Sequence, residues 1–259
     1  MNLVALPAFA DNYIWLLHDE RHAWVVDPGD AAPVLAALDA RGLALAGILV
    51  THHHPDHVGG VDELRPRLAV TGGVVHAPAR ERIPEPCVRH AEGDVVEVLG
   101  HRFEVLEVPG HTAGHIAYLQ RDDADRPLLF CGDTLFSAGC GRLFEGTPAQ
   151  MQHSLARLAA LPADTRVCCT HEYTLANLRF AAAVEPGNGA IATHAGACER
   201  QRAAGQPTLP SSIGLELEIN PFLRCDRPAV IAAARAQGAH DDDAVSVFAA
   251  LREWKNRYR

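Results

Sequence analysis

The 259-residue sequence lacks long hydrophobic runs and Cys-x-x-Cys pairs, and its first residues do not predict a secretory signal. No stretch reaches the roughly 18 consecutive apolar residues that a membrane-spanning helix needs, and the first residues show no basic segment before an apolar core. The seven cysteines form no Cys-x-x-Cys spacing, which argues against a zinc ribbon or a thioredoxin-type redox pair. Scattered thiols without a secretory signal are typical of a reducing compartment, so we expect a cytoplasmic protein.

Cationic side chains are also scarce, and Lys255 is the single lysine. The sequence has 23 Lys and Arg against 32 Asp and Glu, a net charge of −9, which argues against nucleic acid or an anionic membrane as partner. Hydrophobic residues make up 48% and charged residues 21%, as in ordinary globular proteins. At about 150 residues per domain, the length favours two domains.

Alternation of apolar runs and turn residues predicts a mixed α/β domain over residues 1–172. The expected strands are 12–17, 23–26, 46–51, 94–98, 103–108, 116–120, 127–131 and 166–170, with a polar turn at 121–126. Helices are expected at 32–40, ending near Gly42, and at 148–161, with Thr147 as N-cap. Residues 173–259 predict a mainly helical second domain, with helices at 175–184, 190–204, 228–237 and 242–258.

The segment from Thr51 to His57 reads THHHPDH and directly follows an apolar strand. His52 and His54 are two residues apart, so in extended chain they point the same way. Asp56 and His57 follow Pro55, which disfavours a helix before it. One ion rarely takes four ligands from six residues, so two adjacent ions are the simpler interpretation of this cluster.

Three further apolar segments each run into a ligand-type residue: His111, Asp133 and His171. Strands that end at one rim of a sheet would bring these side chains together. The seven candidate metal ligands are His52, His54, Asp56, His57, His111, Asp133 and His171. We expect the other ten of the 15 histidines, His53 and His115 included, to be structural. Imidazole and carboxylate without thiolate suit Zn, Fe or Mn, and such ions make bound water reactive at neutral pH.

The motifs THHHPDH, PGHTAGH, GDTLF and THEYT resemble the metallo-β-lactamase superfamily, and GCGRLFEGT, INPFLR and LREWKNRYR are similar to glyoxalase II, the hydroxyacylglutathione hydrolase family. The resemblance covers nearly the whole chain. It implies an αββα sandwich followed by a smaller α-helical domain. One metal would be held by His52, His54 and His111, and the other by Asp56, His57 and His171. Asp133 would bridge two divalent ions, most simply zinc, beside a hydroxide.

The resemblance also implies the reaction, which is hydrolysis of S-D-lactoylglutathione to glutathione and D-lactate, the second step of methylglyoxal detoxification. Asp56 and Asp133 would be the catalytic carboxylates, and we expect a monomer with a small-molecule substrate. Glutathione is anionic, so an acidic protein needs a local basic site for it. Residues 252–259 carry four cations against one Glu, a net +3, and Arg252 and Lys255 share one helical face. Arg142 and Tyr173 are further candidate substrate contacts.

An alternative within the same fold is a mononuclear iron dioxygenase that acts on glutathione persulfide. It would need fewer ligands and would consume oxygen. The complete ligand set and the basic C-terminal segment weigh against it. A hydrolase of lactones, lactams or phosphodiesters, and a silent metal-binding scaffold, are further alternatives that substrate assays would separate.

Phe144 stands where some members of the family have Tyr. A Phe ring packs on a peptide but donates no hydrogen bond, so one contact of about 0.5–1.5 kcal/mol is missing. We expect Phe144→Tyr to lower KM for S-D-lactoylglutathione in steady-state kinetics. An unchanged or higher KM would contradict this interpretation.

Overall fold

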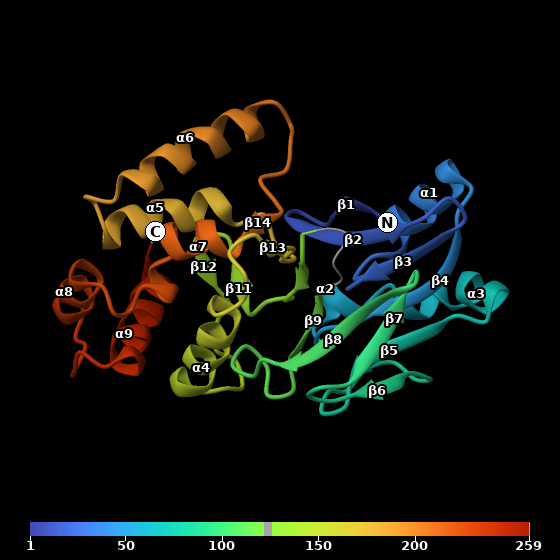
Figure 1. Cartoon of the computed structure of the whole chain (residues 1–259), viewed down its shortest axis with the longest axis horizontal. Coiled ribbons are helices and arrows are strands. Elements are labelled where there is room, and N and C mark those ends of the chain that lie inside the picture. The colour runs from blue at the N-terminus through green and yellow to red at the C-terminus, as the bar shows by residue number, and fades with distance from the viewer. Residues whose placement is uncertain (122–125, 259) are drawn as a thin grey trace. The chain divides into compact units, whose positions relative to one another are not determined.

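The computed structural model describes residues 1–121 and 126–258, which form two compact units (Figure 1). Unit 1 comprises residues 1–107 and 113–132, and unit 2 comprises residues 108–112 and 133–259. Within the described ranges, no helix combines the length and apolarity that crossing a membrane requires. The domain boundary expected between residues 172 and 173 stays a prediction.

Unit 1 contains a six-stranded sheet whose strands follow one another in chain order. The strands are β1 (Asn2–Ala8), β2 (Asn12–His18), β3 (His22–Val26), β4 (Ala44–Leu49), β5 (Val74–Pro78) and β6 (Val88–His90). The first three are antiparallel, and β3 to β6 run parallel. Helices α1 (Ala31–Arg41) and α3 (Val61–Thr71) connect successive parallel strands, and their apolar residues share one core with this sheet.

Helix α1 begins and ends where the sequence predicts. The Asp30 side chain accepts a hydrogen bond from the Ala32 amide at 2.9 Å, which caps the N-terminus. Gly42 ends the helix in the left-handed region, with φ at 64°. These two caps fix the helix between β3 and β4, and β4 leads into the THHHPDH segment.

The remaining strands of unit 1 form antiparallel pairs: β7 (Val95–Val98), β8 (His101–Glu107), β9 (Ile116–Gln120) and β10 (Leu128–Phe130). The buried Tyr118 hydroxyl on β9 donates to the Val50 carbonyl at 3.1 Å, which links this sheet to the end of β4. Residues 122–125 of the turn expected between β9 and β10 lie outside the described residues.

Unit 2 is mainly helical, as predicted. Its helices are α4 (Pro148–Ala159), α5 (Thr174–Val184), α6 (Gly189–Ala203), α7 (Ile213–Ile219), α8 (Pro228–Ala236) and α9 (Ala244–Arg257), with a 3₁₀ turn at Pro221–Leu223. It also contains the strand pairs β11 (Leu135–Phe136) with β12 (Gly139–Cys140) and β13 (Arg166–Val167) with β14 (Ser211–Ser212). Thr147 caps α4 in a capping box with Gln150. Arg259, counted in the terminal charge above, lies outside the described residues.

The expected strand over residues 166–170 is wrong for its second half, because β13 ends at Val167. More generally, His52, His54, His111 and Asp133 lie in loops a few residues beyond strands, whereas Asp56 and His57 lie on the short helix α2 (Pro55–Val58). Pro109 and the positive φ angles of Gly110 (150°) and Gly132 (47°) end strand geometry before His111 and Asp133. Strands β1 and β5 and helices α3 and α7 were not predicted. Pro66 lies inside α3, which obscures its helical pattern.

Candidate functional site

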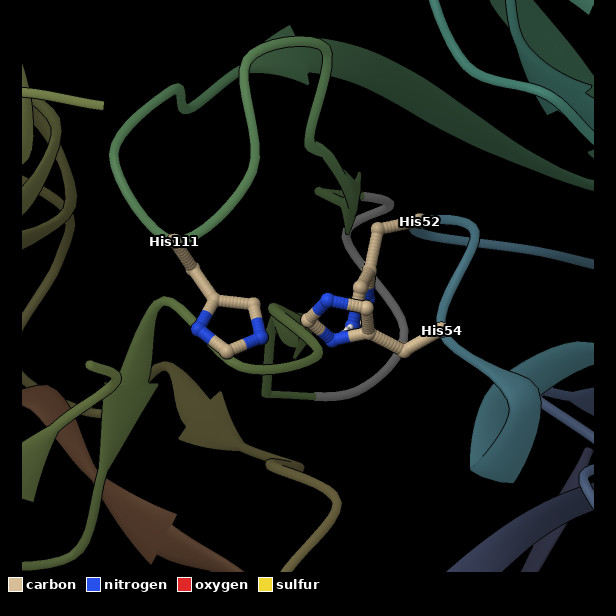
Figure 2. A group of neighbouring side chains, drawn as sticks. All are labelled: His52, His54 and His111. Atoms are coloured by element: carbon tan, nitrogen blue, oxygen red, sulfur yellow. Dashed lines mark hydrogen bonds between the residues drawn. The ribbon is translucent and has the colours of Figure 1, made fainter. Parts of the chain in front are cut away.

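In unit 1, His52 and His54 direct ring nitrogens at each other. His52 Nε2 lies 3.1 Å from His54 Nδ1, and the ring centroids are 4.7 Å apart (Figure 2). His52 Nδ1 lies 3.1 Å from the Thr51 hydroxyl, which itself donates to the Asp27 carboxylate at 2.8 Å. The hydroxyl oxygen therefore accepts from Nδ1–H, and the lone pair of a neutral His52 is on Nε2. This is the nitrogen that faces His54.

His57 lies on the short helix α2 (Pro55–Val58) and is fully buried. Its Nδ1 lies 3.0 Å from Asp27 Oδ2, and its Nε2 lies 3.7 Å from Asp56 Oδ2. Asp27 also accepts a hydrogen bond from the Thr51 amide at 2.8 Å. A carboxylate on one side of an imidazole places the proton there and leaves the other nitrogen as a metal ligand. Asp27 thus orients both His57 and the start of the THHHPDH segment.

Asp56 is held by Asn12, which lies at the start of β2. The Asn12 amide Nδ2 donates to Asp56 Oδ2 at 3.1 Å. A Cβ added at Gly29 would lie 1.9 Å from the Asp56 carbonyl oxygen, so only glycine allows this close backbone approach. Sequence reasoning missed the roles of Asn12 and Asp27, because both read as ordinary turn and strand-edge residues. The sequence signal for Asp27 was the position of Asp27-Pro28-Gly29 directly after a predicted strand.

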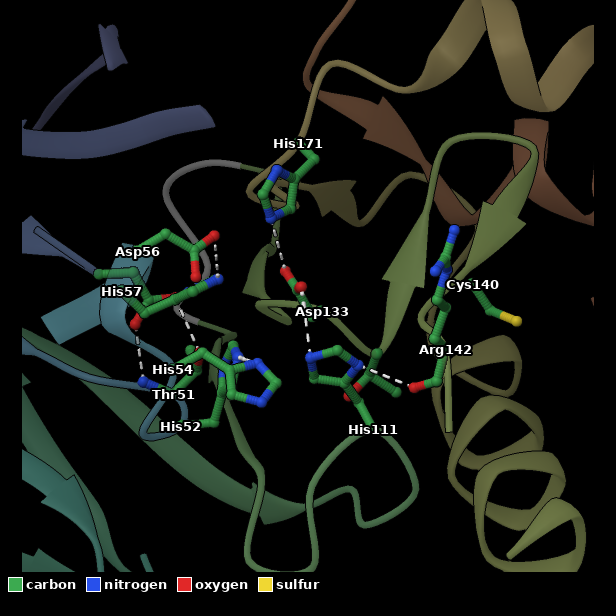
Figure 3. Close-up of polar contacts among 12 residues, drawn as sticks. Thr51, His52, His54, Asp56, His57, His111, Asp133, Cys140, Arg142 and His171 are labelled. Atoms are coloured by element: carbon green, nitrogen blue, oxygen red, sulfur yellow. Dashed lines mark hydrogen bonds and ion pairs between the residues drawn. The ribbon is translucent and has the colours of Figure 1, made fainter. Parts of the chain in front are cut away.

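In unit 2, Asp133 lies between two histidines. Asp133 Oδ2 is 3.4 Å from His111 Nε2, and Asp133 Oδ1 is 3.4 Å from His171 Nε2 (Figure 3). All three side chains are buried. His111 Nδ1 lies 2.8 Å from the Arg142 carbonyl, which only accepts, so Nδ1 carries the hydrogen. In neutral His111 the Nε2 lone pair then faces a carboxylate oxygen.

Within each unit, therefore, an imidazole lone pair faces a carboxylate oxygen: that of the buried His57 faces the partly exposed Asp56, and that of the buried His111 faces the buried Asp133. Two acceptors face each other favourably only when a proton or a cation lies between them. The donors are imidazole nitrogen and carboxylate oxygen, which suit Zn, Fe and Mn. The residues present fit divalent metal binding in both units.

Two of the ten histidines expected to be structural, His53 and His115, have identifiable packing roles. His115 is fully buried and stacks on His52, with centroids 4.6 Å apart. His53 Nδ1 contacts the Glu81 carboxylate, whose other oxygen accepts from the Gly114 amide at 2.8 Å. Both histidines support the metal-binding segment.

Unit 2 also contains a pocket of about 440 Å³ that includes the predicted substrate residues. It is lined by His111, Asp133, Phe136, Cys140, Gly141, Arg142, Phe144, Tyr173, Ala176, Asn177, Arg252, Lys255, Asn256 and Tyr258. The basic residues thus share one cavity with two of the seven candidate ligands, His111 and Asp133.

Two of the three basic residues of helix α9, Arg252 and Lys255, line this pocket. Arg252 is 5% exposed, and its Nη1 donates to the Cys140 carbonyl at 2.8 Å. Lys255 Nζ donates to the Ala176 carbonyl at 3.1 Å. Burial, with Arg252 as the next cause, lowers the pKa of Lys255 to about 8. Removing two cations from water costs free energy, and an anionic ligand in the pocket would offset that cost.

The aromatic candidates lie at the same pocket. Tyr173 stacks on His171 with centroids 4.7 Å apart and an interplanar angle of 3°. Phe144 is 63% exposed and meets His111 edge to face. Both rings line the pocket, and only Tyr173 carries a hydroxyl.

Two family models together match residues 9–258 of the chain. Residues 9–171 match the model of the metallo-beta-lactamase superfamily, and residues 172–258 match that of the hydroxyacylglutathione hydrolase C-terminus. The crystal structure of ETHE1 from Myxococcus xanthus is 28% identical with a TM-score of 0.64, covering 86% of this chain and 84% of that one. TTHA1623, crystallised in a di-iron-bound form, is 27% identical with a TM-score of 0.58, covering 86% of this chain and 100% of that one.

Among curated relatives, the hydroxyacylglutathione hydrolase of Albidiferax ferrireducens is 61% identical, over 100% of both chains. That of Pseudomonas aeruginosa strain LESB58 is 58% identical over 98% of both chains. The chain therefore belongs to the hydroxyacylglutathione hydrolase family, glyoxalase II, within the metallo-beta-lactamase superfamily. This confirms the expected family and fold class.

Replacing Asp133 by alanine should lower the metal content of the purified protein. The change removes the carboxylate that lies beside both His111 and His171, and loss of a ligand weakens metal binding strongly. Elemental analysis gives the metal per chain, and the exposed Asp164→Ala controls for loss of one negative charge. His52→Ala should act likewise from unit 1. Wild-type metal content in Asp133→Ala would exclude Asp133 as a ligand.

Proposed function

We propose that the chain hydrolyses S-D-lactoylglutathione with water to glutathione and D-lactate, the second step of methylglyoxal detoxification. The observation that carries this proposal is the pocket of unit 2, where the buried Arg252 and the half-buried Lys255 share a cavity with the candidate ligands His111 and Asp133. An anionic thioester bound by the cations would present its carbonyl carbon to the ligand end. Membership of the family supports the same reaction.

We propose two divalent ions, most simply zinc, as the cofactors. His52, His54 and His111 would hold one ion, and Asp56, His57 and His171 the other, with Asp133 shared. The donor chemistry within each unit and the proton positions fixed by Asp27 and the Arg142 carbonyl support this set. When bound, the ions supply a hydroxide at neutral pH and polarise the thioester carbonyl.

Asp56 and Asp133 are the proposed catalytic carboxylates. Asp56 is about 40% exposed at its side chain, and Asn12 fixes one of its oxygens. It is therefore placed to orient the attacking water or to accept its proton. The leaving group is a thiolate, which is stable enough to depart without strong help from a general acid. The chain needs no serine or cysteine nucleophile for this reaction.

Substrate recognition is assigned to the walls of the pocket. We propose that Arg252 and Lys255 bind the glycine carboxylate of glutathione and that Arg142 adds positive potential at the rim. Tyr173 and Phe144 would pack on the tripeptide. The monomeric state and the cytoplasmic location stay predictions.

The mononuclear iron dioxygenase is the less supported alternative. Full-length relatives at 61% and 58% identity bear the name hydroxyacylglutathione hydrolase. The C-terminal family model matched by residues 172–258 bears the same name and includes both pocket cations of α9.

The decisive experiment follows loss of the thioester absorbance of S-D-lactoylglutathione, alongside elemental analysis and an oxygen electrode. Thioester loss without oxygen uptake, by protein containing two metals per chain, is the expected result. Oxygen consumption with glutathione persulfide and no thioester hydrolysis would replace the proposal by the dioxygenase. Full activity in protein free of transition metals would exclude the metal chemistry.

Arg252→Ala should raise KM for the thioester about 10-fold or more, since a hydrogen bond to a charged group contributes about 1.5–3 kcal/mol. We expect kcat to change much less, because the interaction is made in both the ground state and the transition state. Arg257→Ala is the matched control, because it removes the same charge from an exposed position of the same helix. Equal KM values for the two variants would contradict the assignment.

The pKa of Lys255 predicts a pH dependence of binding. Its ammonium form predominates below about 8 and is lost above it. KM for the anionic substrate should therefore rise as pH increases from 7 to 9.5. Lys255→Arg stays cationic over this range, so its KM should rise less, while titration of the substrate itself is common to both proteins. Parallel pH profiles would contradict the role of Lys255.

A further inference from the structure

The hairpin β11–β12 of unit 2 joins the two ends of the candidate site. Its first strand begins two residues after Asp133, and its second ends two residues before Arg142. The Gly141 amide donates to the Thr134 carbonyl at 3.3 Å, and a Cβ at Gly141 would lie 1.9 Å from the Asp133 carbonyl oxygen. The position of this hairpin thus determines where the Asp133 carboxylate lies and where the Arg142 carbonyl, which orients His111, lies.

The hairpin is not stable by itself. It has only two residue pairs, Leu135 with Cys140 and Phe136 with Gly139, and isolated two-stranded hairpins are marginal in water. Ala138 in its turn has φ at 54°, a left-handed conformation that is unfavourable for a non-glycine residue. Groups outside the hairpin must therefore hold it in place.

Three buried side chains from helices and helix ends supply that support. Glu216 on α7 accepts a hydrogen bond from the Ala138 amide at 2.7 Å. The amide of Asn220, which follows α7, donates to the carbonyls of Phe136 at 3.1 Å and Gly139 at 2.9 Å. Asn177 on α5 donates to the Ser137 carbonyl at 3.0 Å.

The support is itself a closed network. Asn220 Nδ2 lies 3.0 Å from Glu216 Oε2, and the Ser211 hydroxyl donates to Glu216 Oε1. Glu216 and Asn220 have no exposed surface, and burial raises the pKa of Glu216. A buried carboxylate is costly, and it is satisfied here by donors from the turn of the hairpin, from Asn220 and from Ser211.

We propose that Glu216 and Asn220 are positioning residues of the metal centre: they hold the β11–β12 turn so that Asp133 and the Arg142 carbonyl keep their places on either side of His111. Neither residue lines the pocket. The expected effect on kcat rests on the proposed function, whereas the expected effect on metal binding does not depend on the substrate.

The test compares four variants of the zinc-loaded full-length chain. Glu216→Leu removes the acceptor, Asn220→Ala removes the donor, and Glu216→Gln keeps an oxygen for the Ala138 amide. Val230→Ala, in the buried core of α8, is a control for general loss of stability. Zinc release to a competing chelator, kcat for the thioester and the melting temperature are measured for each.

We expect Glu216→Leu and Asn220→Ala to release zinc about 10-fold faster or more, the usual cost of losing an outer-shell partner, with a parallel fall in kcat. Glu216→Gln should stay near wild type, and Val230→Ala should melt earlier without faster release. If Glu216→Leu and Asn220→Ala lower only the melting temperature, as Val230→Ala does, the proposal is wrong. If the wild type lacks thioesterase activity, the proposed function fails, and zinc release still decides the positioning role.

Discussion

The candidate metal centre depends on where the protons of its histidines are held. His111, His57 and His52 each direct one nitrogen at an acceptor of the protein, which is the Arg142 carbonyl, the Asp27 carboxylate and the Thr51 hydroxyl respectively. Each acceptor fixes the tautomer, so the opposite nitrogen presents its lone pair. If one of these acceptors moved, the hydrogen of the imidazole could shift to the opposite ring nitrogen. That nitrogen would then carry an N–H instead of a lone pair and could not bind a metal ion.

This requirement explains where the backbone departs from regular structure. Asp27, Ala138, Gly110 and Gly132 all have positive φ angles, and each lies within five residues of a candidate ligand or of a residue that orients one. Such conformations are unfavourable for non-glycine residues and persist only where surrounding contacts hold them. In unit 1 the Thr51 and His57 contacts hold Asp27, and in unit 2 the Glu216 network holds Ala138.

Local chemistry made much of the fold predictable. Helix α1 followed from the helical composition of residues 32–40 and from Gly42, and α4 followed from Thr147, because caps act within one turn of the chain. The ligand types followed from THHHPDH, since so many imidazoles in one short segment have few other uses. Asp27 and Glu216 could not be predicted, because an Asp-Pro-Gly sequence reads as a turn and a glutamate on a helix reads as surface. Their roles come from partners 24 to 78 residues away in sequence.

The same limit applies to α9, where Arg252 and Arg257 look alike in sequence. Only tertiary packing buries the first and exposes the second.

The burial of Lys255 has a practical consequence for chemical labelling. The chain has one lysine, and a pKa of about 8 gives that amine a substantial uncharged, nucleophilic fraction in mildly alkaline buffer. Amine-reactive tags, crosslinkers and surface-coupling resins that spare the terminal amino group will therefore attach within the pocket itself. Immobilised or labelled preparations of this protein would have their binding cavity blocked by the very bond that anchors them.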